Sequence, residues 1–190
     1  MKHNLIILLG IQGSGKGRLS EELRTLHDYN FIETGAIFRG LSNDNPVDAE
    51  IMKIMATGAL VSDEMTERLV ESRLGTDHDI LTDGFPRTIP QAEWLMGWAD
   101  AHDFSVQAIC LNIPDEMVFA RINNRVVVDG SMRPDDLDTE SIKKRIASYH
   151  EKTEPMIHFL RHAPHVEFFD IDGTKTRPEV VEDVRKKVGL

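Results

Sequence analysis

Short apolar runs alternate along the chain with longer segments in which apolar side chains recur every three or four residues. The runs lie at residues 5–9, 31–32, 80–82, 106–113 and 166–171. Runs of this kind between turn residues are typical of buried strands, and the segments between them have the periodicity of helices. The alternation predicts an α/β protein in which a parallel sheet carries helices on both faces.

Capping residues and prolines mark where several helices begin and end. Ser62 and Asp63 are good N-cap residues for a helix that follows them. A long helix that begins at Thr139 should bend or break near Pro155, because proline lacks the N–H that a helix interior needs. Residues 125–138 differ from both kinds of element, and we expect them to form a short, charged, hairpin-like loop between two helices.

The composition narrows the class of protein. The chain has 190 residues, which suits one domain with a full core and small insertions, and its content of 41% hydrophobic and 28% charged residues is typical of soluble proteins. The net charge of −10 argues against nucleic acid as an obligatory partner, because phosphate backbones bind basic surfaces. No apolar run is long enough to span a bilayer and the amino terminus lacks a secretory pattern, so we expect a cytoplasmic protein with no membrane partner.

Cysteine and histidine offer little chemistry. Cys110 is the only cysteine, so the chain has no disulfide framework and no cysteine-based zinc site. Its apolar neighbours predict a buried thiol on a strand. His158, His162 and His165 have a spacing that a metal site would use, but Pro164 interrupts it and no carboxylate completes it, so we interpret them as solvated.

A glycine-rich stretch follows the first apolar run. Residues 10–17 have the sequence Gly-Ile-Gln-Gly-Ser-Gly-Lys-Gly and precede a helix-like segment. Glycines at this spacing let backbone N–H groups converge on an anion, and the N-terminus of the helix adds the positive end of its dipole. Lys16 supplies a mobile charge for the outer phosphates. An ordinary strand-to-helix turn is the alternative, but four glycines and a lysine in this context favour a phosphate-binding loop.

Gly17 departs from the general phosphate-loop pattern, in which a serine or threonine follows the lysine and binds Mg²⁺. The form GxxxxGKG resembles that of adenylate kinase and the wider nucleoside monophosphate kinase family. Six segments in all match this family in the same order. Besides the glycine-rich stretch they are Thr34-Gly35 with Arg39, residues 58–64, residues 83–88 with Gln91, Arg133 with Asp135, Asp136, Lys144, Arg145, Tyr149 and His150, and residues 172–175.

The resemblance covers nearly the whole chain and implies a specific architecture and reaction. It implies a P-loop three-layer sandwich, with a five-stranded parallel sheet in a single domain of residues 1–190. Two insertions are implied, one that binds the nucleoside monophosphate near residues 33–61 and a short, zinc-free lid near residues 126–136. The implied reaction is the reversible transfer of the terminal phosphoryl group of ATP to AMP, giving two ADP, by a monomer that uses Mg²⁺.

Phosphoryl transfer between two nucleotides requires aligned phosphate chains and neutralised charge, and this demand predicts converging arginines. The resemblance assigns catalysis to Lys16, Arg87, Arg125, Arg133 and Arg145. It assigns ATP binding to Gly13, Ser14, Gly15, Lys16, Gly17, Arg18, Arg121, Arg125, Gly173 and Lys175. It assigns AMP binding to Thr34, Gly35, Arg39, Ala59, Leu60, Val61, Gly84, Phe85, Arg87, Gln91, Arg133 and Arg145.

A carboxylate at the end of a buried strand needs a partner, and Asp83 occupies such a place. The resemblance implies that Asp83 holds waters of a Mg²⁺ ion between the phosphates, whereas a helix cap is the structural alternative. Arg121 lies one turn before Arg125 on the same helix face. In the family an arginine at that position stacks on the donor adenine.

The identity of the bases rests on few residues. Thr34, Gln91 and the backbone near Val61 match the pattern that binds the adenine of AMP, whereas UMP/CMP kinases tend to have alanine and asparagine in place of the first two. We therefore expect AMP as acceptor, with UMP, CMP or another monophosphate as the alternative. The donor is expected to be ATP, and GTP stays open.

Three positions depart from the family. Gln12 replaces a proline, Ala36 replaces an aspartate, and Arg18 replaces a threonine whose hydroxyl would face the donor phosphates. We expect reduced but present kinase activity, because every arginine assigned to transfer is retained. The alternative of a different class is a regulatory homologue that binds both nucleotides but transfers poorly.

Overall fold

The computed structural model describes residues 2–57, 61–128 and 139–190. One sheet of five parallel strands runs through the molecule in the order β2-β3-β1-β4-β5. Its strands are β1 (Asn4–Leu9), β2 (Tyr29–Glu33), β3 (Asp79–Asp83), β4 (Ser105–Asn112) and β5 (Val166–Asp172). Each apolar run of the sequence is thus a strand, and the predicted α/β fold with a five-stranded parallel sheet is confirmed.

Helices connect the strands. In the described ranges they are α1 (Lys16–Leu26), α2 (Thr34–Arg39), α3 (Pro46–Ala56), α4 (Asp63–Glu71), α5 (Ile89–Ala101), α6 (Asp115–Val128), α7 (Thr139–Ser148), α8 (Glu154–His162) and α9 (Arg177–Val188). None of these helices is long and apolar enough to cross a membrane.

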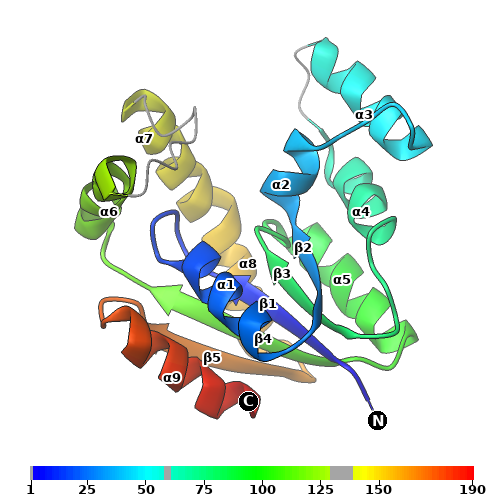
Figure 1. Cartoon of the computed structure of the whole chain (residues 1–190). Helices are drawn as coiled ribbons and strands as arrows, with labels where there is room; N and C mark the ends of the chain where they lie inside the picture. The colour runs from blue at the N-terminus through cyan, green and yellow to red at the C-terminus, as the bar shows by residue number, and fades with distance from the viewer. Residues whose placement is uncertain (1, 58–60, 129–138) are drawn as a thin grey trace.

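The central strand β1 supplies both faces of the core. Leu5, Ile7 and Leu9 point into a cluster with α5 and α8, whereas Ile6 and Leu8 point into a cluster with α1 and α9. These five side chains are at most 3% exposed. A continuous apolar run is what a parallel strand covered on both faces requires. Figure 1 shows the three layers, with the sheet between the two sets of helices.

The carboxyl ends of the strands meet at one edge of the sheet. The turn after β1 lies at this edge, with α2 and α3 on one side of it and α6 and α7 on the other (Figure 1). In the strand order, the connection after β1 leads to β2 on one side of the sheet, and the connection after the neighbouring strand β3 leads to β4 on the other side. Open parallel sheets bind ligands at the carboxyl edge where such a change of direction occurs.

The helix after residue 139 changes its winding before Pro155, as the sequence predicts. A π-helical turn, Tyr149–Thr153, joins α7 to α8, and the N–H of Glu154 bonds the carbonyl of Tyr149 five residues back. Proline at 155 supplies no N–H for the α-helical ladder, and the π-helical turn directly precedes the helix that begins with this proline.

His150 lies on this turn. Its Nδ1 lies 2.9 Å from Glu154 Oε2, and its Nε2 lies 2.9 Å from Asp115 Oδ2. Both hydrogen bonds raise the pKa of His150, and the one with Glu154 has the larger effect.

The expectation of a hairpin-like loop from residue 125 onward was wrong for its first part. Helix α6 continues to Val128, so residues 125–128 are helical, and residues 129–138 lie outside the described residues. The earlier turns of α6 are anchored by Val118 and Ile122, which are buried in a cluster with Ile142 of α7. Valine costs a helix only a few tenths of a kcal/mol per residue relative to alanine, so an anchored helix extends through a valine run.

Candidate active site

The turn after β1 has the backbone of an anion-binding loop. Gly10, Gly13 and Gly15 have φ of 137°, 82° and 108°, a region that favours glycine. A Cβ on Gly10 would lie 2.6 Å from the carbonyl oxygen of Leu111, so the turn also needs glycine for space. Helix α1 begins at Lys16, and its first N–H groups lack helical partners. The turn therefore presents backbone donors at a helix N-terminus, which is a site for phosphate.

Two side chains complete this turn. Lys16 Nζ donates to the carbonyls of Gly10 at 2.7 Å and Ile11 at 3.2 Å, so the ammonium group lies over the turn. The hydroxyl of Ser14 is buried and finds no hydrogen-bond partner among the described residues. A Cβ added at Gly15 or Gly17 would meet nothing within 4 Å. The turn thus combines a cation, an unsatisfied buried hydroxyl and open space beside them.

Arg121 of α6 links this turn to the loop after β5. Its Nη1 donates to the carbonyl of Ser14 at 3.3 Å, and its Nη2 donates to the carbonyl of Gly173 at 2.7 Å. Gly173 packs so closely that an added Cβ would lie 2.8 Å from Ile113 Cγ2. The structure therefore brings together three segments that the sequence assigned to one nucleotide. Lys175 is exposed and bonds Asp183 Oδ2 on α9 at 2.6 Å, so its ammonium lies beside that helix.

A second group of assigned residues gathers at the carbonyl of Gly84. This oxygen accepts from Thr34 Oγ1 at 2.9 Å and from Arg87 Nε at 2.7 Å. Gly84 has φ of 84°, and a Cβ there would lie 2.8 Å from the Thr34 hydroxyl. Thr34 is buried and Arg87 is exposed. The end of β2 and the loop after β3 are thus joined through one backbone oxygen.

Arg39 and Phe85 flank this second group. Arg39, at the end of α2, forms an ion pair with Glu33 at 3.2 Å. A Cβ on Gly35 would lie 3.1 Å from Arg39 Nη1, so glycine there gives the guanidinium room. Phe85 is 1% exposed and packs edge-on against Trp94, with ring centroids 6.0 Å apart. Its role in the described structure is to anchor the loop in the core.

Gln91 is 6% exposed, and it is hydrogen-bonded to residues of two segments. Its Oε1 accepts from the N–H of Arg87 at 2.9 Å, and its Nε2 donates to Asp63 Oδ1 at 2.7 Å. Thr88 Oγ1 donates to the other oxygen of Asp63 at 2.9 Å. The sequence marked Asp63 only as an N-cap candidate, whereas Ser62 is the cap. Its partners lie 25 and 28 residues away, so no local signal reveals this contact.

Asp83 lies where the two groups meet. In the sheet it is paired with Leu8 of β1 and Glu33 of β2, so it stands beside the start of the glycine-rich turn and beside α2. Mg²⁺ in nucleotide sites takes one or two carboxylates, phosphate oxygens and water. A carboxylate at the end of the strand beside the glycine-rich turn is the kind of donor that such an ion takes, so Asp83 fits it.

For the remaining assigned residues, the structure gives the element on which each lies or no description. Arg18 is exposed on the first turn of α1, and Arg145 is half-buried on the last turn of α7. Val61 directly precedes the cap of α4. Outside the described residues lie Ala59, Leu60 and Arg133, and for Arg125 only the helical backbone is described. Helices α6 and α7 pack with the glycine-rich turn through one apolar cluster formed by Ile11, Val118, Ile122 and Ile142.

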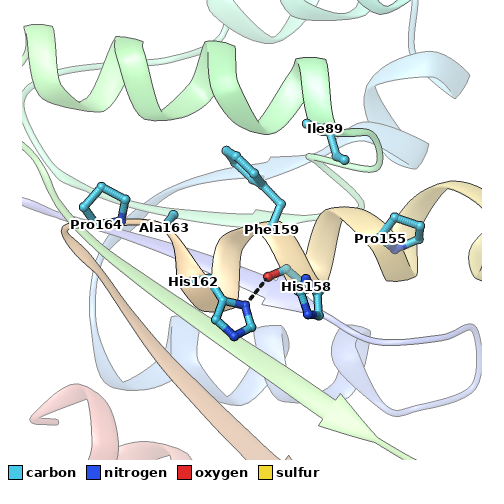
Figure 2. A pocket seen from close by; sticks show the side chains of 7 residues that line it. All are labelled: Ile89, Pro155, His158, Phe159, His162, Ala163 and Pro164. Carbon is cyan, nitrogen blue, oxygen red and sulfur yellow. Dashed lines mark hydrogen bonds between the residues drawn. The ribbon is translucent and has the colours of Figure 1, made fainter.

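A hollow of about 620 Å³ lies elsewhere, between the start of α5 and α8 (Figure 2). Its lining consists of Ile89, Pro155, His158, Phe159, His162, Ala163 and Pro164. His158 and His162 are exposed, and His162 Nδ1 lies 2.9 Å from the carbonyl of His158. Its seven lining residues include no lysine or arginine, the side chains that bind phosphate most strongly.

Comparison of the sequence with known proteins shows the family of this chain. A family profile described as adenylate kinase matches residues 8–164. The chain belongs to the adenylate kinase family. Adenylate kinase of Clostridium botulinum (strain Alaska E43 / Type E3) is 32% identical to it, over 97% of this chain and 98% of the relative. Adenylate kinases of Clostridium perfringens (strain SM101 / Type A) and Lachnoclostridium phytofermentans are 31% and 32% identical, over 97% and 94% of this chain and 98% and 95% of theirs.

Family membership confirms the resemblance stated from the motifs. The chain is an enzyme of the adenylate kinase family, a nucleotide-binding transferase of the nucleoside monophosphate kinase type. The two groups of residues at the sheet edge are therefore interpreted below as the two halves of a kinase site.

Proposed function

We propose that this enzyme transfers the terminal phosphoryl group of ATP reversibly to AMP and yields two ADP. The observation that carries the proposal is the arrangement at the carboxyl edge of the sheet. There the glycine-rich turn with Lys16 and Arg121 stands on one side of Asp83, and the carbonyl of Gly84 with Thr34 and Arg87 stands on the other. Two anion-binding groups on either side of one carboxylate suit two phosphate chains that meet end to end.

The donor half of the proposed site consists of the glycine-rich turn and the loop after β5. Backbone N–H groups of the turn and Lys16 bind the phosphates of ATP, and Ser14 donates its hydroxyl to them. Arg121 and the segment that contains Gly173 border the donor adenine. The hydrogen bonds from Arg121 to Ser14 and Gly173 support this placement, because they hold both segments against one guanidinium.

The acceptor half consists of α2, the loop after β3 and the start of α5. Arg39 and Arg87 bind the phosphate of AMP, and Thr34, Val61 and Gln91 contact its base. Arg125, Arg133 and Arg145 complete the transfer site and stabilise the charge of the moving phosphoryl group. Arg39 and Arg87 are exposed on their elements, so both guanidinium groups are accessible to a ligand.

The proposal includes Mg²⁺ as the cofactor. Asp83 would hold it through water, and the ion would neutralise charge on the phosphates of the donor. The proposal also includes a cytoplasmic location and a monomer in solution. Sedimentation of the purified protein, with and without nucleotide, tests the monomer.

Transfer from ATP to a panel of AMP, dAMP, GMP, UMP and CMP, measured as ADP formed, tests the proposal. Turnover with AMP that exceeds turnover with the other acceptors supports it. Turnover confined to UMP and CMP would replace AMP by a pyrimidine acceptor. Binding of both nucleotides without turnover would make the protein a regulatory homologue, a second candidate that the departures at Arg18 and Ala36 favour.

A further inference from the structure

The side-chain amide of Gln91 is held in one orientation by partners of opposite hydrogen-bonding character. The N–H of Arg87 can only donate, and it meets Oε1 at 2.9 Å. The carboxylate of Asp63 can only accept, and it meets Nε2 at 2.7 Å. A rotated amide would face both partners with the wrong atom. The chemistry of the two neighbours therefore fixes which end of the amide carries the oxygen.

Asp63 is itself held in place. It is the first residue of α4, and its second oxygen accepts from Thr88 Oγ1 at 2.9 Å. Thr88 is the N-cap of α5, and its hydroxyl accepts from the N–H of Gln91 at 3.4 Å. The carboxylate thus receives two donors from the start of α5. It cannot turn away from Gln91 without losing Thr88 as well.

The amide keeps capacity for a ligand. After its contacts with Arg87 and Asp63, Oε1 retains a lone pair and Nε2 retains an N–H. A 6-amino purine presents a donor at position 6 beside an acceptor ring nitrogen, whereas a 6-oxo purine presents an acceptor at position 6. An amide with a fixed orientation can match only one of these patterns.

We propose that Asp63 is a positioning residue that sets the purine specificity of the acceptor site. By fixing the Gln91 amide, it makes the site accept a 6-amino purine monophosphate and reject a 6-oxo purine monophosphate. This inference rests on the proposed function, in which Gln91 contacts the acceptor base. A 6-oxo purine would require the rotated amide, which sets Oε1 against the carboxylate and the NH₂ group against the N–H of Arg87.

The test compares kcat/KM for AMP and for IMP, whose base is a 6-oxo purine, with ATP as donor. The wild-type enzyme should favour AMP by at least about a hundredfold, because binding of IMP would leave two buried groups without suitable partners. Asp63→Asn offers a donor as well as an acceptor at nearly the same volume. It should lower the AMP-to-IMP ratio about tenfold, through a relative gain for IMP, while the N–H of Arg87 maintains the rest of the preference.

Two further variants separate positioning from structure. Thr88→Val removes the other hydrogen bond of Asp63 and the cap of α5 but keeps the bond between Asp63 and Gln91, so it should lower thermal stability and change the AMP-to-IMP ratio less than Asp63→Asn does. In a Gln91→Ala background, Asp63→Asn should leave the ratio unchanged, because the effect of Asp63 passes through Gln91. Melting temperatures identify which variants are folded, and the wild-type ratio needs no variant at all.

The outcomes keep the two proposals apart. A wild-type enzyme that turns over UMP or CMP but not AMP overturns the proposed function. A wild-type enzyme that turns over AMP and IMP equally overturns the specificity inference alone. The same holds if Asp63→Asn leaves the ratio unchanged, or if Thr88→Val changes it as much as Asp63→Asn does.

Discussion

At the scale of single residues, hydrogen bonds between side chains and backbone carbonyls join the segments of the site. The carbonyl of Gly84 accepts from Thr34 and Arg87, and those of Ser14 and Gly173 share the guanidinium of Arg121. Each such oxygen fixes the distance between segments that are far apart in the sequence. The motifs predicted which residues belong together, but the shared oxygen that holds them cannot be predicted from a motif.

Arg18 is the residue whose departure from the family bears most directly on rate. It is exposed on the first turn of α1, next to Gly17, where an added Cβ would meet nothing within 4 Å. Arg18→Thr would restore a hydroxyl that can face the donor phosphates, and one such hydrogen bond corresponds to about a fivefold gain in kcat/KM for ATP. A coupled assay at saturating AMP measures it. Arg18→Ala is the control, and an equal gain in that variant, or no gain in either, would contradict the role of the hydroxyl.

Asp79 provides a stability test far from the chemistry, at the amino end of β3. Its Oδ1 accepts from the N–H of Asn4 at 2.8 Å and lies 3.2 Å from His3 Nδ1, and its Oδ2 lies 2.9 Å from His27 Nε2. Burial acts to raise the pKa of this carboxyl, but the hydrogen bonds from Asn4 and His3 and the charge of His27 outweigh it and lower the pKa. The folded pKa is therefore below the unfolded one, so this stabilisation is present at neutral pH and is lost as the pH falls through the folded value.

Asp79→Asn should lower the free energy of unfolding by about 1–3 kcal/mol at neutral pH, because it removes charge-assisted hydrogen bonds. The difference in unfolding free energy between variant and wild type should shrink as the pH falls, because the wild-type carboxyl is then protonated and neutral, like the amide of the variant. Urea unfolding at a series of pH values measures both. A difference that stays constant down to the acid limit would contradict the assignment.

At the scale of elements, one buried ion pair ties the helices between β2 and β3 together. Asp48 of α3 is 2% exposed, and Arg73, just after α4, donates from Nη2 to both of its oxygens at 2.7 and 2.8 Å. The N–H of Ser42 adds a third hydrogen bond at 3.3 Å. Asp63, which we propose positions Gln91, begins α4, so this pair fixes the carboxyl end of that helix to α3.

Arg73→Met should destabilise these helices by about 2–4 kcal/mol, because it leaves the buried carboxylate of Asp48 without its main partner. Hydrogen exchange of the α3 amides, compared with those of β1, shows whether the loss is local. Arg68→Met is the matched control, because Arg68 pairs with Glu50 on the same two helices in a largely exposed ion pair at 3.2 Å. Equal effects of the two variants would contradict the importance of burial.

The elements themselves were largely predictable, and their exceptions have physical causes. All five strands and the change of winding of the long helix before Pro155 follow from local pattern. The continuation of α6 through residues 125–128 does not, since packing of Val118 and Ile122 decides it and local propensity does not. The pair of Asp48 with Arg73 was also missed, because a charge on an amphipathic helix looks alike in sequence whether it is solvated or buried.

At the scale of the whole molecule, an acidic chain places the cations of the proposed site at one edge of one sheet. The net charge is −10, yet Lys16, Arg87 and Arg121 all lie on the segments that follow the carboxyl ends of β1, β3 and β4. Backbone N–H groups and the dipole of α1 add positive potential there without adding residues. In the proposed function, this edge holds two nucleotides at once, with their phosphates facing each other.

Calorimetric titration with a dinucleotide in which five phosphates join two adenosines tests this claim directly. Such a molecule spans both halves of the proposed site, so we expect one molecule bound per chain and weaker apparent binding when either ATP or AMP is present. Two molecules per chain, or competition from only one of the two nucleotides, would contradict a shared site at the carboxyl edge of the sheet.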